Sequence, residues 1–353
     1  MRAWEKNIRK VEPYVPGEQP KQPGIIKLNT NENPYPPAPQ VVEAIAELDS
    51  DKFRLYPDPT SSKLVDAIAG FYGVDSEQVF VGVGSDDVIS MAFMTFFNSD
   101  KPILFPDITY SFYSVWAEVH RIPYERIPLD KDFKIVPQDY MKQNGGIIFP
   151  NPNAPTSVYL PLESVEEIIK ANQDVIVIVD EAYIDFGGES ALKLLDKYEN
   201  LLVVQTYSKS RSMAGMRIGY AIGSSRLIKA LNDVKYSINS YTMNYPSIFL
   251  GSKALEDREY FEATLDKIIT TREEFCEKIS ALGFTFPKSG ANFIFATHPE
   301  YSAKELFEAL KKENIYVRYF AQPRIDNYLR ITVGTKEDMD VLCEFLKNYI
   351  QKH

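Results

Sequence analysis

The sequence predicts an α/β fold in which helices cover both faces of a large, mostly parallel sheet. Between residues 80 and 225, short apolar runs alternate with stretches whose apolar residues recur at helical spacing, as in chains of β-α units. The run 175–179 is apolar without interruption, which is typical of a strand buried on both faces. A length of 353 residues leaves room for a second, smaller domain.

The composition argues against several classes of function. The chain has 39 Lys and Arg against 49 Asp and Glu, a formal net charge of −10. Such a surface repels nucleic acid and anionic membranes, so an anion has to bind at a local basic site. Cys276 and Cys343 form no redox or zinc motif, and the three histidines are far apart. We therefore expect no metal, no nucleic-acid partner and no membrane association.

The N-terminal residues 1–40 are predicted to form an extended arm, because eight prolines between positions 13 and 39 disfavour long helices. This segment lacks the apolar core of a signal peptide, so we expect a cytoplasmic protein. Helical spacing of apolar residues begins at 41–48 and recurs at 64–71. The following segments are predicted to be six strands and a helix: strands 79–83, 102–105, 147–149, 175–179, 201–205 and 218–222, and helix 161–171.

After about residue 245 the pattern changes to that of a smaller α+β domain. Apolar residues at helical spacing predict a long helix over 261–282, which could lead out of the first domain. Further elements are expected as strands at 292–296, 315–318 and 328–333 and helices at 303–313 and 336–351. We accordingly divide the chain into an arm (1–40), a large domain (41–245) and a small C-terminal domain (246–353).

Polar residues follow several of the predicted strands, at the edge of an open α/β sheet where ligands bind. Gly84-Ser85-Asp86 opens a helix, whose free N–H groups suit an anion. Asp180 ends an apolar strand, where a buried carboxylate is costly unless it meets a cation. Lys209, beside small hydroxyl residues, could have the lowered pKa of a nucleophile. Each feature alone also fits a purely structural role: the serine and the aspartates could be helix caps, and the lysine could be a solvated surface residue.

Together these groups match the needs of pyridoxal phosphate. The lysine amine can form a Schiff base with the cofactor aldehyde, and the carboxylate can keep the pyridine nitrogen protonated. The hydroxyls, an arginine and the helix start can bind the phosphate. The sequence therefore predicts a cofactor-dependent enzyme, with these groups on successive strand ends.

Several motifs resemble those of the class I and II pyridoxal-phosphate aminotransferases, and among them the histidinol-phosphate aminotransferases. The segment from Ser208-Lys209 to Arg217-Ile218-Gly219-Tyr220 is similar to the lysine signature of that family. The resemblance implies fold type I, with a seven-stranded large-domain sheet, and a homodimer with shared active sites in which the arm packs with the small domain and the partner subunit. The other matching segments are 29–35, 54–58, 151–153, 180–183 and 329–335.

The resemblance also implies a role for each matching residue. Lys209 would hold the cofactor and move the proton, Asp180 would pair with the ring nitrogen, and Tyr183 would hydrogen-bond the phenolic oxygen. The other cofactor-binding residues implied are Asn153 for the phenolic oxygen, Tyr110 for the ring face, Ser85, Asp86, Thr206, Ser208 and Arg217 for the phosphate, and Tyr56, which would reach the neighbouring subunit's cofactor. The implied substrate-binding residues are Arg330, Arg318, Asn33 and Tyr14.

The strand pattern supports Arg330 independently, because Leu329, Ile331 and Val333 share one strand face and leave Arg330 on the other. Arg324 is a third arginine nearby. The implied reaction moves an amino group between L-histidinol phosphate and 2-oxoglutarate, in histidine biosynthesis. Two alternatives stay open: an aminotransferase for aromatic amino acids, and a pyridoxal-phosphate-dependent threonine-phosphate decarboxylase with the same motifs.

Overall fold

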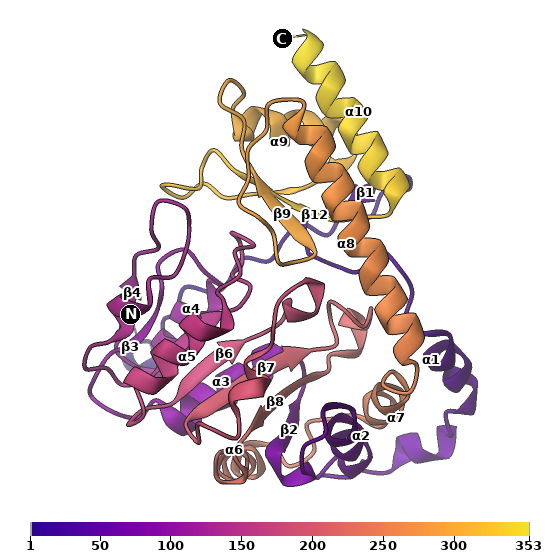
Figure 1. The fold of residues 1–353 in the computed structure, drawn as a ribbon. Coiled ribbons are helices and arrows are strands. Elements are labelled where there is room, and N and C mark those ends of the chain that lie inside the picture. The colour runs from indigo at the N-terminus through magenta and orange to yellow at the C-terminus, as the bar shows by residue number, and fades with distance from the viewer. Residues whose placement is uncertain (1, 353) are drawn as a thin grey trace.

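The computed structural model describes residues 2–352 and shows two main sheets joined by a long helix (Figure 1). The larger sheet has seven strands in the order β2-β8-β7-β6-β5-β3-β4, and the smaller has three in the order β11-β12-β9. The long helix α8 (Arg258–Ser280) runs from the level of the large sheet to that of the small one. The chain is thus an α/β fold with a mostly parallel seven-stranded sheet, as the sequence predicts.

The large sheet is parallel except for β8 (Gly219–Gly223), which runs antiparallel to both its neighbours. The expected six strands are all present. The seventh, β4, is an edge strand that exposes Glu125 and Arg126, so it has no apolar run to reveal it. The other strands are β2 (Val79–Gly82), β3 (Ile103–Pro106), β4 (Tyr124–Ile127), β5 (Ile147–Pro150), β6 (Val177–Asp180) and β7 (Leu201–Thr206).

Helices cover the large sheet on both faces. In β6, Ile178 packs in one apolar cluster with Val88 of α3, whereas Val177 and Val179 pack on the opposite face with Ile168 of α5. This burial on both faces explains the uninterrupted apolar sequence of the strand. The helices are α1 (Pro39–Ala44), α2 (Ser62–Tyr72), α3 (Ser85–Phe96), α4 (Phe112–His120), α5 (Leu162–Ala171), α6 (Ser225–Ile238) and α7 (Tyr245–Lys253).

The small sheet packs against α8, α9 (Ala303–Lys312) and α10 (Lys336–Lys352). The strand expected at 315–318 is split in two: β10 (Ile315–Tyr316) pairs with β1 (Ile26–Lys27), and β11 (Arg318–Tyr319) pairs with β12 (Leu329–Thr332). The third strand of the sheet is β9 (Phe293–Ala296). The N-terminal segment is thereby joined to C-terminal elements, and Leu28 enters their core.

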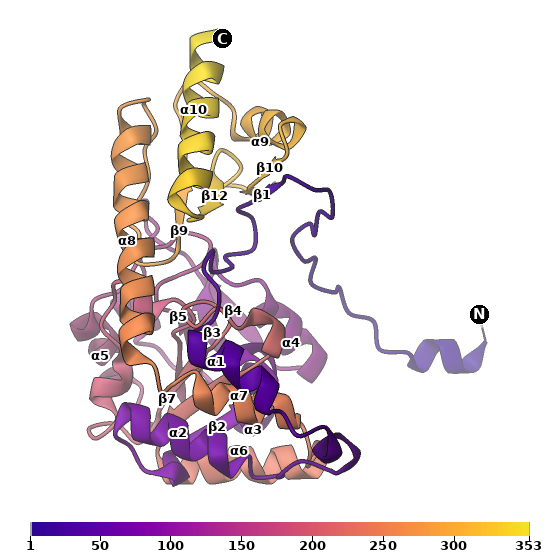
Figure 2. The same cartoon turned by 90° about the vertical axis from the view of Figure 1, so that its right-hand side faces the viewer.

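The segment before β1 runs out from the body of the molecule, with the short 3-10 helix η1 (Ala3–Asn7) at its far end (Figure 2). Its irregular course agrees with the expected extended arm. Among the described residues, no helix is both long enough and apolar enough to cross a membrane.

A close backbone contact places the start of α3 against β8. A Cβ atom at Gly219 would lie 2.2 Å from the backbone nitrogen of Ser85 and 2.2 Å from the carbonyl carbon of Gly84. Gly84 itself has a φ of 89°, in the region that favours glycine. These two glycines therefore bring the first turn of α3 next to the loop that carries Arg217.

We expect Gly219→Ala to lower the free energy of unfolding by at least about 2 kcal/mol, because the added methyl group overlaps backbone atoms that cannot rotate away. Gly215→Ala is the matched control, since a Cβ atom there meets nothing within 4 Å. Urea unfolding followed by circular dichroism measures both variants. Equal stability of the two would contradict the contact.

Candidate active site

A cavity of about 620 Å³ lies where the carboxyl ends of the large-sheet strands face the small sheet. Residues that follow β2, β3, β5, β6 and β7 line one side, and Arg318 and Arg330 of the small sheet line the other. Two pieces of the N-terminal segment, 12–17 and 29–32, complete the wall. Three parts of the chain that are distant in sequence therefore form one site.

One end of the cavity is suited to an anion. The helix α3 begins at Ser85, where the first backbone N–H groups have no helical acceptor. Arg217 points its guanidinium at this turn, with Nη2 3.2 Å from Oδ2 of Asp86. Thr206 donates its hydroxyl to Ser208 at 3.0 Å in the same part of the wall. All five residues predicted to hold a phosphate thus line the cavity.

Asp180 is a buried carboxylate without a cation. It is 5% exposed, and it accepts hydrogen bonds from the hydroxyl of Tyr113 at 2.8 Å and the backbone of Ala182 at 3.3 Å. Within residues 2–352, no basic side chain lies within ion-pair distance of it. Burial raises the pKa of the carboxyl to about 6. A cationic ligand group in the cavity would remove this cost.

Lys209 presents an amine that can lose its proton near neutral pH. Burial, and next the nearby Arg330, lower the pKa of Lys209 to about 8. Its Nζ donates to the carbonyl oxygen of Thr30 at 3.0 Å and lies 5.8 Å from the ring centre of Tyr183. The hydroxyl of Tyr183 in turn accepts from Nδ2 of Asn31 at 2.9 Å.

Two arginines at the other end of the cavity face each other across a strand pair. Arg318 of β11 is directly opposite Arg330 of β12. Arg330 donates from Nη2 to the carbonyl of Asn29 at 2.9 Å, but its buried Nε has no partner among the described residues. Like charges placed opposite each other repel, so an anion between them would stabilise both. Arg324, by contrast, is held by Asp107 at 3.1 Å.

Aromatic residues form part of the wall between the two charged ends. Tyr14 of the arm stacks on Phe112 with ring centres 4.3 Å apart. Tyr110 donates its hydroxyl to Oδ1 of Asp86 at 2.9 Å. Both tyrosines line the cavity, so the predicted residues Tyr14 and Tyr110 lie beside the lysine and the arginines.

Two of the predicted residues lie behind the wall. The side-chain amide of Asn153 donates to the carbonyl of Ile108 at 2.9 Å and to Thr156 at 2.8 Å. Asn33 donates to the backbone carbonyls of Lys209 and Ser210 at 3.1 and 3.2 Å. Neither side chain is part of the cavity lining. Their contacts position the wall, and direct binding of a ligand by either stays a prediction.

Tyr56 also lies away from the cavity of its own chain. Its side chain is 82% exposed, and its ring stacks on Tyr241 with centres 4.6 Å apart. A role for Tyr56 can therefore only concern a neighbouring molecule, and that role stays a prediction.

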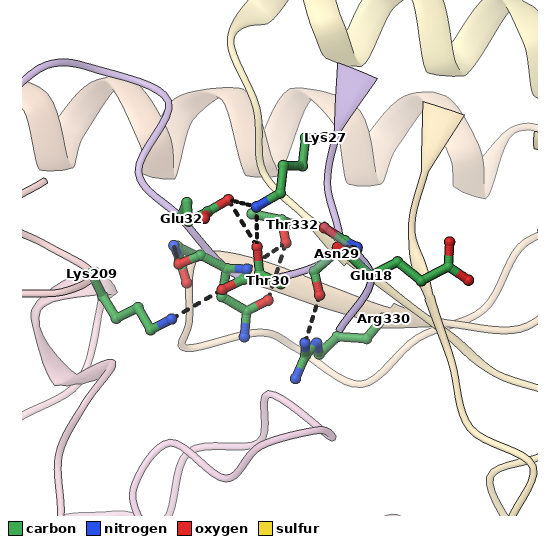
Figure 3. A network of polar contacts seen from close by, with 10 residues as sticks. Glu18, Lys27, Asn29, Thr30, Glu32, Lys209, Arg330 and Thr332 are labelled. Atoms are coloured by element: carbon green, nitrogen blue, oxygen red, sulfur yellow. Dashed lines mark hydrogen bonds and ion pairs between the residues drawn. The ribbon is translucent and has the colours of Figure 1, made fainter. Parts of the chain in front are cut away.

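The segment Asn29–Asn33, here called the strap, connects these groups (Figure 3). Its successive residues contact Arg330, Lys209 and Tyr183 through the Asn29 carbonyl, the Thr30 carbonyl and the Asn31 side chain. Thr332 of β12 and Asn292 hold the strap itself through further hydrogen bonds to Asn31. One segment of five residues thereby joins the small sheet to the loop after β7.

Sequence reasoning missed Tyr113 and Asn31. Tyr113 occupies the buried face of α4, where an aromatic residue is ordinary, so nothing distinguished it. Asn31 belongs to a segment that was noticed only through its resemblance to a family motif. Its partner Tyr183 is 152 residues away, a pairing that no local pattern indicates. Among the described residues, no group of three potential metal ligands is arranged to hold an ion.

The amino-acid sequence matches a known protein family and is similar to several proteins of known name. Residues 23–346 match the family described as "Aminotransferase class I and II". The "Histidinol-phosphate aminotransferase 1" of Hydrogenovibrio crunogenus is 52% identical over 348 residues, covering 99% of this chain and 98% of that protein. The "Histidinol-phosphate aminotransferase" of Clostridium beijerinckii is 51% identical over 344 residues, covering 98% and 96%.

Solved structures share the fold at lower sequence identity. The crystal structure of the histidinol-phosphate aminotransferase from Clostridium acetobutylicum matches with a TM-score of 0.86 and 22% identity, covering 93% of this chain and 100% of that one. That of the histidinol-phosphate aminotransferase from Sinorhizobium meliloti, in complex with pyridoxal-5'-phosphate, matches with a TM-score of 0.84 and 20% identity, covering 93% and 91%.

The environment of Asp180 predicts a stability difference in the protein free of ligands. The pKa of Asp180 is raised to about 6 on folding, so the folded state binds the proton more tightly than the unfolded state and loses stability as pH rises from 4 to 6. Asp180→Asn keeps an acceptor for Tyr113 and removes this loss. We expect the variant to gain up to about 3 kcal/mol over wild type by pH 7, and little at pH 4.

Urea unfolding at a series of pH values measures this difference. Asp174→Asn, at an exposed aspartate ahead of the same strand, is the control and should follow wild type at every pH. A constant offset between Asp180→Asn and wild type from pH 4 to 7 would show that the carboxyl does not carry the predicted cost.

Proposed function

The chain belongs to the class I and II aminotransferase family, and we propose that it moves an amino group between L-histidinol phosphate and 2-oxoglutarate, a step of histidine biosynthesis. The observation that carries the substrate is the arginine pair, in which Arg330 has a buried Nε without a partner among the described residues. This pair lies opposite the anion-binding end at Ser85 and Arg217. The cavity therefore suits a cofactor phosphate and a separate substrate anion. The names of the relatives support histidinol phosphate as that substrate.

Pyridoxal phosphate is the cofactor, and the residues of the cavity fit it. Asp180 lacks the cation that a protonated pyridine nitrogen offers. The first turn of α3 and Arg217 are suited to its phosphate, and the amine of Lys209 to its aldehyde. When bound, the cofactor supplies an electron sink for the charge that develops on the substrate when its Cα–H bond breaks.

In this mechanism Lys209 is the acid–base group. A pKa of about 8 lets its Nζ release and accept a proton near neutral pH, so it can take the proton from the substrate Cα and return it. Asp180 would hold the proton on the ring nitrogen of the cofactor, and Tyr113 orients Asp180 through its hydrogen bond. Tyr183 and Tyr110 line the cavity and would help to shield the reacting atoms from water.

The two arginines account for both halves of the exchange. A planar guanidinium binds phosphate and carboxylate with the same fork of N–H donors. Arg330 and Arg318 can therefore hold the phosphate of histidinol phosphate and then a carboxylate of 2-oxoglutarate in turn. Tyr14 of the arm offers an aromatic surface near this end for the imidazole ring.

Absorbance of the bound cofactor tests the proposed reaction. We expect histidinol phosphate and 2-oxoglutarate to reverse each other's spectral changes in the purified enzyme, and Lys209→Ala to lose both the wild-type spectrum and turnover, by at least about a thousandfold. Conversion by phenylalanine but not by histidinol phosphate would favour an aromatic aminotransferase. Release of carbon dioxide from threonine phosphate without 2-oxoglutarate would favour the decarboxylase.

We further propose that the enzyme works as a homodimer in which Tyr56 reaches the cofactor phosphate of the partner subunit. Large apolar side chains are exposed near Tyr56 and along the arm, and patches of this kind mark interfaces. Near Tyr56 they include Phe53 (59% exposed) and Leu55 (53%), and on the arm Trp4 (58%) and Val15 (71%). A dimer would bury these groups and bring Tyr56 to a second cavity.

We also propose that the enzyme works in the cytoplasm and that its chain divides near residues 40 and 245. Both cysteines are free of disulfides, as expected in a reducing compartment. The pairing of β1 with β10 supports an arm that belongs with the small domain. Because α7 still packs in the core of the large domain, the second division falls a little after residue 245, between α7 and the start of α8 at Arg258.

Mixed dimers test the shared site. Tyr56→Ala and Lys209→Ala should each be strongly impaired alone. After the two variants are unfolded and refolded together, half of the dimers are hybrids, and each hybrid has one site with an intact Lys209 and an intact Tyr56. We expect about a quarter of wild-type activity to return. No recovery in confirmed hybrids would show that Tyr56 does not act across the interface.

A further inference from the structure

The amine of Lys209 has a built acceptor in the strap. Its Nζ donates to the carbonyl oxygen of Thr30 at 3.0 Å (Figure 3). The side chain of the same threonine belongs to a polar cluster with Lys27 and Glu32. Lys27 donates to the Thr30 hydroxyl at 2.7 Å and pairs with Glu32, and the hydroxyl donates to Glu32 at 2.8 Å.

This cluster fixes the carboxylate of Glu32 at the edge of the cavity. Glu32 is half-buried, yet the hydrogen bond and charge of Lys27 outweigh burial and lower the pKa of Glu32. The carboxylate therefore stays ionised at neutral pH. Figure 3 shows the Glu32 carboxylate at the Thr30 hydroxyl and Lys27, whereas Lys209 reaches the carbonyl oxygen of the same threonine. The two charges attract each other without forming a direct ion pair.

The other charged groups around Lys209 oppose one another. Arg330 and Arg217 disfavour its protonated form, whereas Asp86 and Glu32 favour it. Each acid is itself ion-paired, Asp86 with Arg217 at 3.2 Å and Glu32 with Lys27, so the field of each is partly cancelled. Glu32 is the one of the two that belongs to the strap, where its carboxylate accepts from the hydroxyl of Thr30, the residue whose carbonyl accepts from Lys209.

We propose that Glu32 is a positioning residue that, together with the Thr30 carbonyl, holds the Lys209 ammonium whenever the lysine is free of cofactor. The proposal rests on the proposed function, in which the substrate amine displaces Lys209 and leaves it as a free amine inside a buried site. A free ammonium in the cavity needs an acceptor and a counter-charge. The strap provides the Thr30 carbonyl as the acceptor and Glu32, which also lines the cavity, as the acidic group.

Two substitutions in the same cluster, Glu32→Gln and Lys27→Met, test the proposal, because it predicts that they change the reactivity of Lys209 in opposite directions. In the full-length protein freed of cofactor, the rate at which acetic anhydride labels Lys209, followed by peptide mass spectrometry across pH, reports the fraction of neutral amine. Glu32→Gln removes an attractive charge and should raise the rate at pH 7 by about threefold. Lys27→Met leaves Glu32 uncompensated and should lower the rate by a similar factor. Damage to the strap alone would move both variants in the same direction.

Glu18→Gln is the matched control, because Glu18 lies on the same arm but its carboxylate pairs with Lys311 rather than with the cluster. Its labelling profile should follow wild type. An unchanged or lower rate in Glu32→Gln, or shifts of equal sign in both cluster variants, would overturn the proposal. Reduction of wild-type enzyme with borohydride and pyridoxal phosphate separately tests the proposed function: labelling of Lys209 upholds it, and no labelling refutes it.

Discussion

Two adjacent backbone carbonyls, those of Asn29 and Thr30, hold the two side chains on which the site depends. Arg330 comes from the small sheet and Lys209 from the loop after β7, and each donates to one of these carbonyls. Because a strap of five residues connects the two donors, their separation is set by the chain itself. Its bond to Thr332 adds a second attachment to β12. The strap therefore helps to set the distance between Arg330 and the reactive amine.

The site concentrates charges that the fold alone does not satisfy. Asp180 is buried without a cation among the described residues, and Lys209 is partly buried near two arginines. Burial moves the pKa of each toward neutral pH, as is common where proton transfer occurs. A positively charged ring nitrogen and two bound anions would relieve these costs together. The net charge of −10 describes the whole chain, whereas the cavity has its own local group of arginines. An acidic chain and an anion-binding cavity are therefore compatible.

The fold and the centre of the site can be predicted from the sequence, because both are marked by patterns among residues that are close together in the chain. Apolar runs reveal six of the seven large-sheet strands. The edge strand β4 is polar and has no such run, so the sequence does not predict it. Asp180 and Lys209 are recognisable because they end or follow buried strands. The strap contacts are not recognisable, since they join residues such as Asn31 and Tyr183 that no periodicity relates. Likewise, a tyrosine on a core-facing helix surface gives no sign that its hydroxyl supports a carboxylate.

The most direct test of the account compares two substrates that differ only in the anion. Single-turnover reactions with L-histidinol phosphate and L-histidinol present the same amine and imidazole to Lys209, with and without a group for Arg318 and Arg330. If these arginines select the substrate, the phosphorylated amine should react at least about a hundredfold more efficiently. Equal efficiency for the two amines would contradict a site organised around the arginine pair.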